Sequence, residues 1–429
     1  MQVSMKYGKK GLDIDFADSW TVEKIEKKDM PLLEGPQQSL QHVLSHPVGA
    51  PSLEESVRTA SSACILICDI TRPVPNGTLL PVLIRRLISA GIKADAITVL
   101  VATGLHRPNE GDELLELVGN QWVLDTVKVV NHFARNDEDH VDLGQTTDGL
   151  PIRLDRRFVR ADLKIVTGLV EPHFMAGFSG GRKVIMPGIA HQDAIRRFHT
   201  AHYLENPKAA NCVLGGNPLH AAQQDIVRKL PMVTAINTVI DEQRRIAFIN
   251  YGEIEKSHTE AVNFMRPFIE IQVPQKFSTV VTSAGGYPLD HTYYQTVKGM
   301  VGAMDILRPG GNLVIVSKCS GGMGSAEYIQ AQKRLHRLGP QIFLKNLISK
   351  PVAEIDEWQT EMQLKPMRIG SVHLYSEMLP DDLRRITGVQ QVTSLPETLK
   401  SCVQLHEDQR VAVIPDGPYT IPVFTGEFT

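Results

Sequence analysis

The feature that most constrains this chain is a repeated alternation of short, uniformly apolar segments with segments of helical spacing. Parallel strands covered by helices on both faces produce this pattern, because neither face of such a sheet meets water. The sequence therefore predicts an α/β fold with Rossmann-like domains. The predicted strands are Ala63–Asp69, Ile97–Thr103, Leu163–Leu169, Val233–Ile240, Val280–Ala284, Leu313–Ser317, Ile369–Tyr375 and Val411–Ile414. The predicted covering helices are Leu79–Ala90, Ile254–Phe268, Thr292–Leu307 and Ala326–Leu335.

A polar break with a proline, Gln272–Phe277, separates two blocks of strands and helices. We place the domain boundary there, which predicts an N-terminal α/β domain over 1–275 and a C-terminal α/β domain over 276–416. The tail Gly417–Thr429 has two prolines and no helical period, and we expect it to pack back on the first domain.

The composition is that of an ordinary globular protein, with 42% hydrophobic residues, 22% charged residues and a formal net charge of -3. A nucleic-acid partner is not expected, because no strong positive field attracts phosphates. No signal peptide or membrane-spanning run is found, so the cytoplasm is the expected location. The cysteine count is odd, and we interpret Cys64 and Cys68 as core thiols rather than metal ligands.

The loops that follow the predicted strands hold the residues that look chemical, and such loops form the usual site of α/β proteins. After Asp69, the segment Thr71–Thr78 leads into a helix, whose free N–H groups could receive an anion such as phosphate. Arg72 could add a bidentate contact to a phosphate or carboxylate. The alternative interpretation is a capped helix with Arg72 paired to Asp69.

Two histidines, His106 and His173, follow apolar strands by a few residues, next to a glycine or proline. A single histidine there is more often structural. Two at equivalent strand ends favour acid–base work, because imidazole gives and takes protons near neutral pH.

A glycine-rich run, Gly177–Lys183, allows close backbone approach to a ligand, but it lacks the Walker spacing of a phosphate loop. Lys183 enters an apolar segment, and desolvation there should lower its pKa and expose a nucleophilic amine. His199 and His202 lie three apart, as neighbours on one helical face would, and imidazoles of this kind suit nickel or zinc. No further protein ligands complete such a site, so a metal would need help from a cofactor.

In the second half, a helix starting near His291 would turn Tyr294, Gln295 and Lys298 the same way. Gln295 and Lys298 could then hold a carboxylate and a hydroxyl, although a solvated helix start is the alternative. Trp358 lies in a polar setting, where it is a packing residue or a cofactor wall.

Taken in order, these residues resemble the nickel-pincer lactate racemase family over roughly residues 60 to 360. The matching landmarks are Asp69-x-Thr71-Arg72-Pro73, Gly104-Leu105-His106-Arg107, Glu171-Pro172-His173, Gly180-Gly181-Arg182-Lys183, Pro187-Gly188, His199, Tyr294-Gln295-x-x-Lys298 and Asp356-x-Trp358.

The resemblance implies two α/β domains that enclose a cleft, and a pyridinium mononucleotide whose sulfur-containing arms grip nickel. It assigns Lys183 as the covalent tether of this cofactor and His199 as the protein ligand to nickel. Thr71, Arg72, Gly180 and Gly181 would bind the mononucleotide, with Asp69 in support. Arg72, Gln295 and Lys298 would orient the substrate carboxylate, and Tyr294 and Trp358 would wall the site. Cofactor biosynthesis proteins are implied partners.

The implied reaction is racemisation or epimerisation of a small 2-hydroxy acid, such as lactate, malate or a sugar acid. One of His106 and His173 takes the hydroxyl proton while the hydride passes to the cofactor, and the flat keto acid is then reduced from the other face. The alternatives are a noncatalytic nickel-cofactor carrier, a nicotinamide-dependent dehydrogenase, which should show Gly-x-Gly-x-x-Gly, and a zinc hydrolase.

Overall fold

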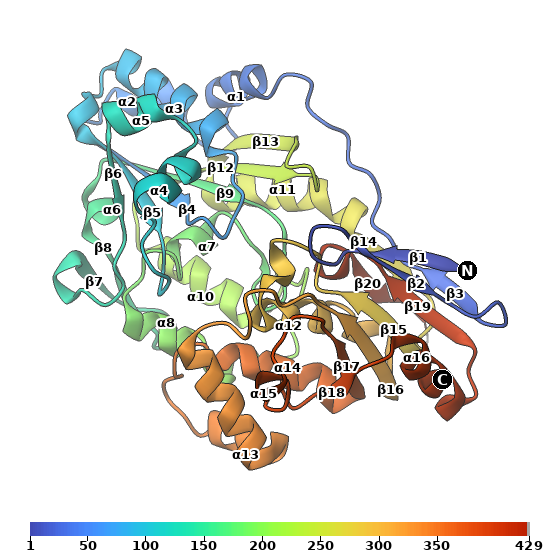
Figure 1. Cartoon of the computed structure of the whole chain (residues 1–429). Helices are drawn as coiled ribbons and strands as arrows, with labels where there is room; N and C mark the ends of the chain where they lie inside the picture. Colours follow the sequence, from blue (N-terminus) through green and yellow to red (C-terminus); the bar gives the residue numbers. More distant parts are fainter. Residues whose placement is uncertain (427–429) are drawn as a thin grey trace. The chain divides into compact units, whose positions relative to one another are not determined.

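A computed structural model describes residues 1–426 and divides into two compact α/β units (Figure 1). We call 30–198 with 213–266 the central unit, and 1–29, 199–212 and 267–429 together the terminal unit. Residues 427–429, the end of the predicted tail, lie outside the described residues. The predicted α/β class and its two-domain organisation are confirmed.

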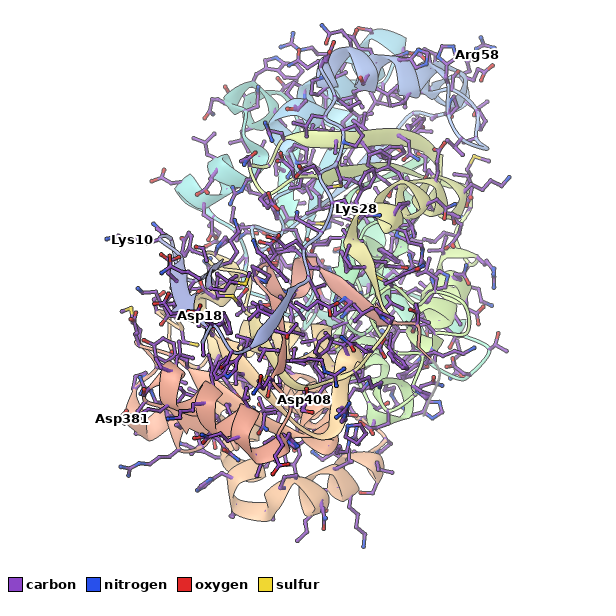
Figure 2. All side chains as sticks on the ribbon, turned by 90° about the vertical axis from the view of Figure 1, so that its right-hand side faces the viewer. Lys10, Asp18, Lys28, Arg58, Asp381 and Asp408 are labelled. Carbon is purple, nitrogen blue, oxygen red and sulfur yellow. The ribbon has the colours of Figure 1, made fainter. Side chains whose placement is uncertain are left out.

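The units are not the contiguous ranges that the sequence suggested. The chain passes into the terminal unit for the last time after Arg266 rather than near residue 275. Two earlier segments, 1–29 and 199–212, also belong to the terminal unit. The N-terminal segment belongs there because its strand β3 (Thr21–Lys24) pairs with a strand near the C-terminus, and the N–H of Lys28 donates to Phe268 O at 2.8 Å. Figure 2 labels Lys28 on this segment.

The sheet of the central unit has the order β13-β12-β9-β4-β5-β6. All its neighbours run parallel except β13, which is antiparallel to β12. Its strands are β4 (Ala63–Cys68), β5 (Ile97–Ala102), β6 (Lys128–Asn131), β9 (Leu163–Leu169), β12 (Val233–Ile240) and β13 (Ile246–Glu253). Small antiparallel pairs are β7 (His140–Gln145) with β8 (Pro151–Asp155), and β10 (Pro172–His173) with β11 (Gly177–Phe178).

Apolar residues of β4, β5 and the covering helices form one continuous core, which explains why these strands have no polar side. The helices of this unit are α1 (Pro36–Ser45), α2 (Leu53–Val57), α3 (Asn76–Ala90), α4 (Gly111–Val118), α5 (Gln121–Thr126), α6 (Arg156–Arg160), α7 (Arg182–Ile185), α8 (Gln192–Phe198), α10 (Pro218–Val227) and α11 (Ile254–Ile269), whose last turn crosses into the terminal unit.

The sheet of the terminal unit is parallel throughout, in the order β18-β17-β16-β15-β19-β3. Its further strands are β15 (Phe277–Ser283), β16 (Leu307–Val316), β17 (Ser371–Tyr375), β18 (Gln390–Val392) and β19 (Arg410–Ile414). The hairpin β1 (Gln2–Met5) and β2 (Leu12–Asp15) is separate, and β20 (Ile421–Phe424) in the tail pairs with β14 (Glu270–Val273). The helices are α9 (Ala201–Leu204), α12 (Tyr293–Gly302), α13 (Ala326–Ile348), α14 (Glu357–Ile369), α15 (Asp381–Arg384) and α16 (Leu395–His406).

All eight predicted strands and all four predicted helices are present, with displaced ends. The helix expected to reach Leu307 stops at Gly302, and β16 begins at Leu307. The helix expected to end at Leu335 continues to Ile348 across a non-helical residue, Gly339. Ile369, expected in a strand, is instead the last residue of α14.

The cysteines of β4 have no disulfide partner, and burial raises the pKa of both Cys64 and Cys68. Cys64 is a buried core thiol as predicted, whereas Cys68 at the strand end is half-buried. Across residues 1–426, no helix combines the length and apolar character needed to cross a membrane.

Candidate active site

The carboxyl ends of three adjacent strands in the central unit carry most of the predicted site residues. The strands β9, β4 and β5 are neighbours in the sheet and run parallel, so their following loops leave from the same edge. Asp69 directly follows β4, His106 follows β5, and Glu171 to His173 follow β9. Hydrogen bonds between these loops confirm that the chain brings them together.

His106 and Asp69 form a hydrogen-bonded pair across two of these loops. His106 Nδ1 lies 2.5 Å from Asp69 Oδ2, while the other carboxylate oxygen accepts from the N–H and hydroxyl of Thr71 at 3.2 and 2.5 Å. Burial by itself raises the pKa of Asp69, but the hydrogen bond and charge of His106 and the bond from Thr71 lower it overall. An ionised Asp69 holds the proton of neutral His106 on Nδ1, so Nε2 is the basic nitrogen of a side chain that is 60% exposed.

His173 is held in the opposite way, by backbone N–H groups. Its Nδ1 accepts from the N–H of Met175 at 3.3 Å and from the N–H of Ala176 at 3.1 Å. A ring nitrogen that accepts these bonds carries no proton, so neutral His173 has its proton on Nε2. The two histidines therefore present different forms, a basic nitrogen on His106 and an N–H donor on His173.

Arg72 forms an ion pair with Glu171, with Nη1 2.5 Å from Oε1. Both side chains are mostly buried. The charge of Arg72 also acts on Asp69 and lowers its pKa, while the hydrogen bonds of Asp69 go to Thr71 and His106. The sequence analysis gave Glu171 no role. Its signal was an acidic residue two positions after a buried strand.

The helix α3 begins at Asn76, so Asn76, Gly77 and Thr78 form its first turn instead of preceding it. Its N-cap, Pro75, makes no side-chain capping bond. The Asn76 amide points away from the helix end and donates to Leu117 O at 3.0 Å. Anion binding at this helix start stays a prediction.

The glycine-rich run packs tightly against the protein itself. Gly180 and Gly181 have φ values of 78° and 47°, which favour glycine. A Cβ on Gly180 would lie 2.9 Å from the side chain of Val170, and one on Gly181 would lie 3.1 Å from the ring of His258. These contacts account for both glycines without a ligand, and their role in cofactor binding stays a prediction.

Lys183 lies in the first turn of the short helix α7 and is half-buried. Its amine has no hydrogen bond or ion pair with any residue in the described part of the chain. Desolvation, reinforced by the charge of Arg72, lowers the pKa of Lys183 to about 8. The neutral, nucleophilic form of this amine is therefore far more populated near neutral pH than in an ordinary lysine, which fits a covalent tether.

The remaining predicted residues belong to the terminal unit. Tyr294, Gln295 and Lys298 lie on α12, which confirms the predicted helix, and all three are half-buried. Trp358 on α14 is buried and donates from Nε1 to the Tyr294 hydroxyl at 3.2 Å. Gln295 Oε1 is buried and has no hydrogen-bond partner among residues 1–426.

His199 lies in the turn between α8, which ends at Phe198, and α9, which begins at Ala201. The prediction that His199 and His202 are neighbours on one helical face is therefore wrong, since the helix breaks between them. His202 is exposed, whereas the His199 ring packs on Trp358 with centroids 4.6 Å apart. In the described residues, no group of three or more His, Cys, Asp or Glu side chains is arranged to hold a metal ion.

Comparison with known proteins decides the family. The family model of the lactate racemase N-terminal domain matches residues 7–212, and that of the lactate racemase C-terminal domain matches residues 273–421. The chain is similar to the lactate racemase of Lactiplantibacillus plantarum, with 31% identity over 89% of each chain. It is also similar to that of Thermoanaerobacterium thermosaccharolyticum, with 29% identity over 97% of each.

The chain belongs to the lactate racemase family.

Solved structures agree with this membership. The lactate racemase apoprotein of T. thermosaccharolyticum matches 98% of this chain with a TM-score of 0.90 and 28% identity, and the match covers all of that structure. A Thermotoga maritima protein, 19% identical over 93% of this chain with a TM-score of 0.67, shares the fold. This member of the lactate racemase family is accordingly an enzyme, an isomerase of the racemase type. The two family models leave 213–272 between them, the segment that supplies β12, β13 and α11.

Proposed function

We propose that this enzyme interconverts the two enantiomers of a small 2-hydroxy acid, with lactate as the first candidate. The observation that carries the proposal is the pair of unlike histidines at one sheet edge, His106 held by Asp69 and His173 held by backbone N–H groups. Relatives named lactate racemase support the choice of substrate.

His106 accepts the hydroxyl proton of one enantiomer at Nε2, because its Nδ1 proton is engaged with Asp69. The ring becomes imidazolium, and the buried carboxylate of Asp69 stabilises that positive charge. Loss of this proton, together with the hydride on the same carbon, converts the hydroxy acid to a flat 2-keto acid. The flat product has lost the original stereochemistry.

His173 serves the opposite face by giving its Nε2 proton to the keto oxygen as that oxygen becomes an alkoxide. The N–H groups of Met175 and Ala176 stabilise the negative charge left on the ring. Proton exchange with solvent then restores both rings. In the reverse direction the same steps run backward: the His173 ring that lacks its Nε2 proton takes the hydroxyl proton, and the imidazolium of His106 returns its proton, so each direction uses both.

The residues fit a covalently tethered cofactor, because the Lys183 amine is half-buried, has a lowered pKa and is unpaired among the described residues. When bound, a nickel-bearing pyridinium-3,5-bisthiocarboxylic acid mononucleotide would supply the hydride acceptor. Lys183 would tether it, His199 would be the protein ligand to nickel, and Thr71, Arg72, Gly180 and Gly181 would contact the mononucleotide. Proteins that make this cofactor are then required partners.

Arg72 would bind the substrate carboxylate, and its ion pair with Glu171 fixes the guanidinium for this purpose. In the terminal unit, Gln295 and Lys298 keep their predicted role toward substrate oxygens, and the unsatisfied Oε1 of Gln295 can accept a hydrogen bond from a substrate hydroxyl. Tyr294 and Trp358 form the apolar wall.

The test is a chiral assay of the cofactor-loaded enzyme with single enantiomers of lactate, malate, phenyllactate and sugar acids. Inversion of lactate at its carbinol carbon, with no release of keto acid, would establish the function and the substrate. Inversion of another acid in the panel would replace lactate while keeping the mechanism. Verified cofactor loading without inversion of any acid would favour a noncatalytic cofactor carrier.

A further inference from the structure

We propose that two buried residues without a part in the chemistry above, His258 and Arg182, are positioning residues for the loop from Glu171 to Lys183. The inference rests on the proposed function, because that loop carries His173 and the tether. Neither residue touches the reacting atoms in this scheme. They act through the backbone of Ser179 and Ala176.

The first link runs from His258 on α11 to Ser179. His258 is buried and donates from Nε2 to Ser179 O at 2.8 Å, and its ring lies directly beneath Gly181. Burial, with the charge of Arg182 adding to it, keeps the pKa of His258 well below its ordinary value, so the ring is neutral. A neutral ring that donates from Nε2 has Nδ1 as its acceptor, and Arg182 Nη1 lies close to both ring nitrogens, at 3.1 Å from Nδ1 and 3.2 Å from Nε2.

Ser179 is in turn hydrogen-bonded to Glu171, so the bond from His258 also restrains the Glu171 backbone. Ser179 N–H donates to Glu171 O at 2.9 Å, and the N–H of Glu171 donates to Ser179 Oγ at 3.1 Å. The Ser179 hydroxyl in turn donates to Leu169 O at 2.7 Å. His258 therefore fixes the segment that places the Glu171 carboxylate against Arg72.

The second link runs from Arg182 to His173. Arg182 Nη1 lies 3.1 Å from His258 Nδ1, and Nη2 donates to Ala176 O at 3.4 Å. The N–H of the same residue, Ala176, donates to His173 Nδ1. Arg182 thus holds Ala176 in place, and the N–H of Ala176 determines which nitrogen of His173 carries the proton.

The burial of Arg182 is costly, which makes a packing role a poor explanation. Its side chain is 1% exposed, and it has no ion pair with a carboxylate among residues 1–426. A guanidinium in such a place costs far more than an apolar side chain of the same volume. Because Arg182 directly precedes Lys183, anchoring its guanidinium in the interior also fixes the backbone from which the Lys183 amine projects.

The test compares His258→Leu, which removes both hydrogen bonds, with His258→Gln, whose amide can still donate to Ser179 O and accept from Arg182. His220→Leu is the matched control. His220 is a neighbouring histidine of low pKa on α10, and its Nδ1 makes no hydrogen bond within the described residues.

The main measurement is the pH dependence of Lys183 acylation in the apo chain, followed by peptide mass spectrometry. We expect His258→Leu to raise the titration midpoint of Lys183 by about one unit, since the loop no longer holds the amine in its desolvated position. Acylation at pH 8 then slows about fivefold. His258→Gln should stay within about twofold of the wild type, and His220→Leu should match it.

Hydrogen exchange supplies a second measurement on the same proteins. His258→Leu should speed exchange in peptides covering 171–183 and leave those covering β15 and β16 unchanged. An unaltered Lys183 titration and unaltered exchange in folded His258→Leu would overturn the proposal. If that variant does not fold, Gly181→Ala replaces it, because the new Cβ would push the loop away from His258.

These measurements need neither cofactor nor substrate, so they are separate from the test of racemisation. If the loaded enzyme inverts no acid but the Lys183 titration midpoint shifts as expected, the proposed function is wrong and the positioning role of His258 and Arg182 stands. In the loaded enzyme, His258→Leu should lower kcat about tenfold or more with little change in KM, and His258→Gln should restore most of it.

Discussion

The two six-stranded sheets differ in what covers the carboxyl ends of their strands. In the central sheet, the loops after β4, β5 and β9 hold charged and titratable side chains bonded to one another. In the terminal sheet, the turn between β1 and β2 fills the equivalent place. Lys6 N–H donates to Pro415 O after β19, Tyr287 N–H donates to Gly8 O after β15, and Tyr7 is buried.

We infer from this difference that the carboxyl ends of a parallel sheet can hold a ligand only where the chain itself leaves those ends open. The terminal unit closes them with its own hairpin, and its predicted site residues come from α12, α14 and the segment 199–212 instead. Substitutions at the central sheet edge should therefore affect chemistry, and substitutions at the terminal sheet edge should affect stability. The predictions below test that division.

The largest effect is expected for Lys183→Ala. Without this amine the covalent adduct cannot form, so the intact mass should equal that of the bare polypeptide and turnover should vanish. Lys256→Ala, an exposed lysine of the same unit, should keep the adduct and serves as the control. An adduct still present on Lys183→Ala would show that another residue is the tether.

His106→Ala and His173→Ala should each lower racemisation in both directions by about 10²- to 10⁴-fold, because each direction uses both rings. The cofactor should stay bound, as shown by intact mass and nickel content. His173→Ala should still oxidise one enantiomer to keto acid in a single turnover, because neutral His106 remains as the base. His202→Ala, an exposed histidine, is the control. Substantial racemisation by either variant would contradict the two-base scheme.

In the terminal unit, Asp290→Ala should weaken the closure of the sheet edge. Asp290 is buried and its Oδ2 accepts from the N–H of Gly8 at 2.6 Å and of Lys318 at 3.2 Å. Losing these bonds should lower the free energy of unfolding in urea by about 2 kcal/mol. Turnover per folded molecule should change less than about threefold, and Asp13→Ala, exposed on β2, should change neither quantity. A large loss of turnover in Asp290→Ala would contradict the idea that the terminal sheet edge contributes to stability and not to chemistry.

The last prediction concerns Glu361 on α14, whose pKa burial raises to about 8, with the charge of Glu205 adding to it. The folded state binds this proton up to about pH 8, whereas the unfolded chain releases it near the ordinary value. Stability should therefore fall as pH rises between about 5 and 8, by on the order of 5 kcal/mol from this group. Glu361→Gln should remove that part of the dependence. An identical slope in both proteins would show that Glu361 is ionised in the folded state.

The sequence predicts the long central strands well, because a strand such as Ile97–Ala102 that is buried on both faces needs an unbroken apolar run. It also places Asp69, His106 and His173 at strand ends, since these positions depend only on where each strand stops. The strands at the sheet edges are harder to predict from the sequence. Thr21–Lys24 is polar, and only its distant partner, Arg410–Ile414, makes it a strand.

The helix α14 was missed for a related reason. Its residues Glu357–Pro366 are mostly polar and have no apolar stripe, yet all of them are buried, so the period that identifies a helix is absent. The partners of Trp358 and the role of Glu171 were missed because side-chain pairing across loops leaves no local pattern. The break after Phe198 was missed because a two-residue turn without glycine or proline gives no signal.

The pairing of β3 with β19 sets the order in which the protein can be completed during synthesis. Thr21 is synthesised long before the strand that it joins, which ends at Ile414. The strands of the central sheet, by contrast, have all emerged once Glu253 has left the exit tunnel. A nascent chain can therefore assemble its central sheet long before β3 finds its partner β19, so the terminal sheet is completed later than the central one.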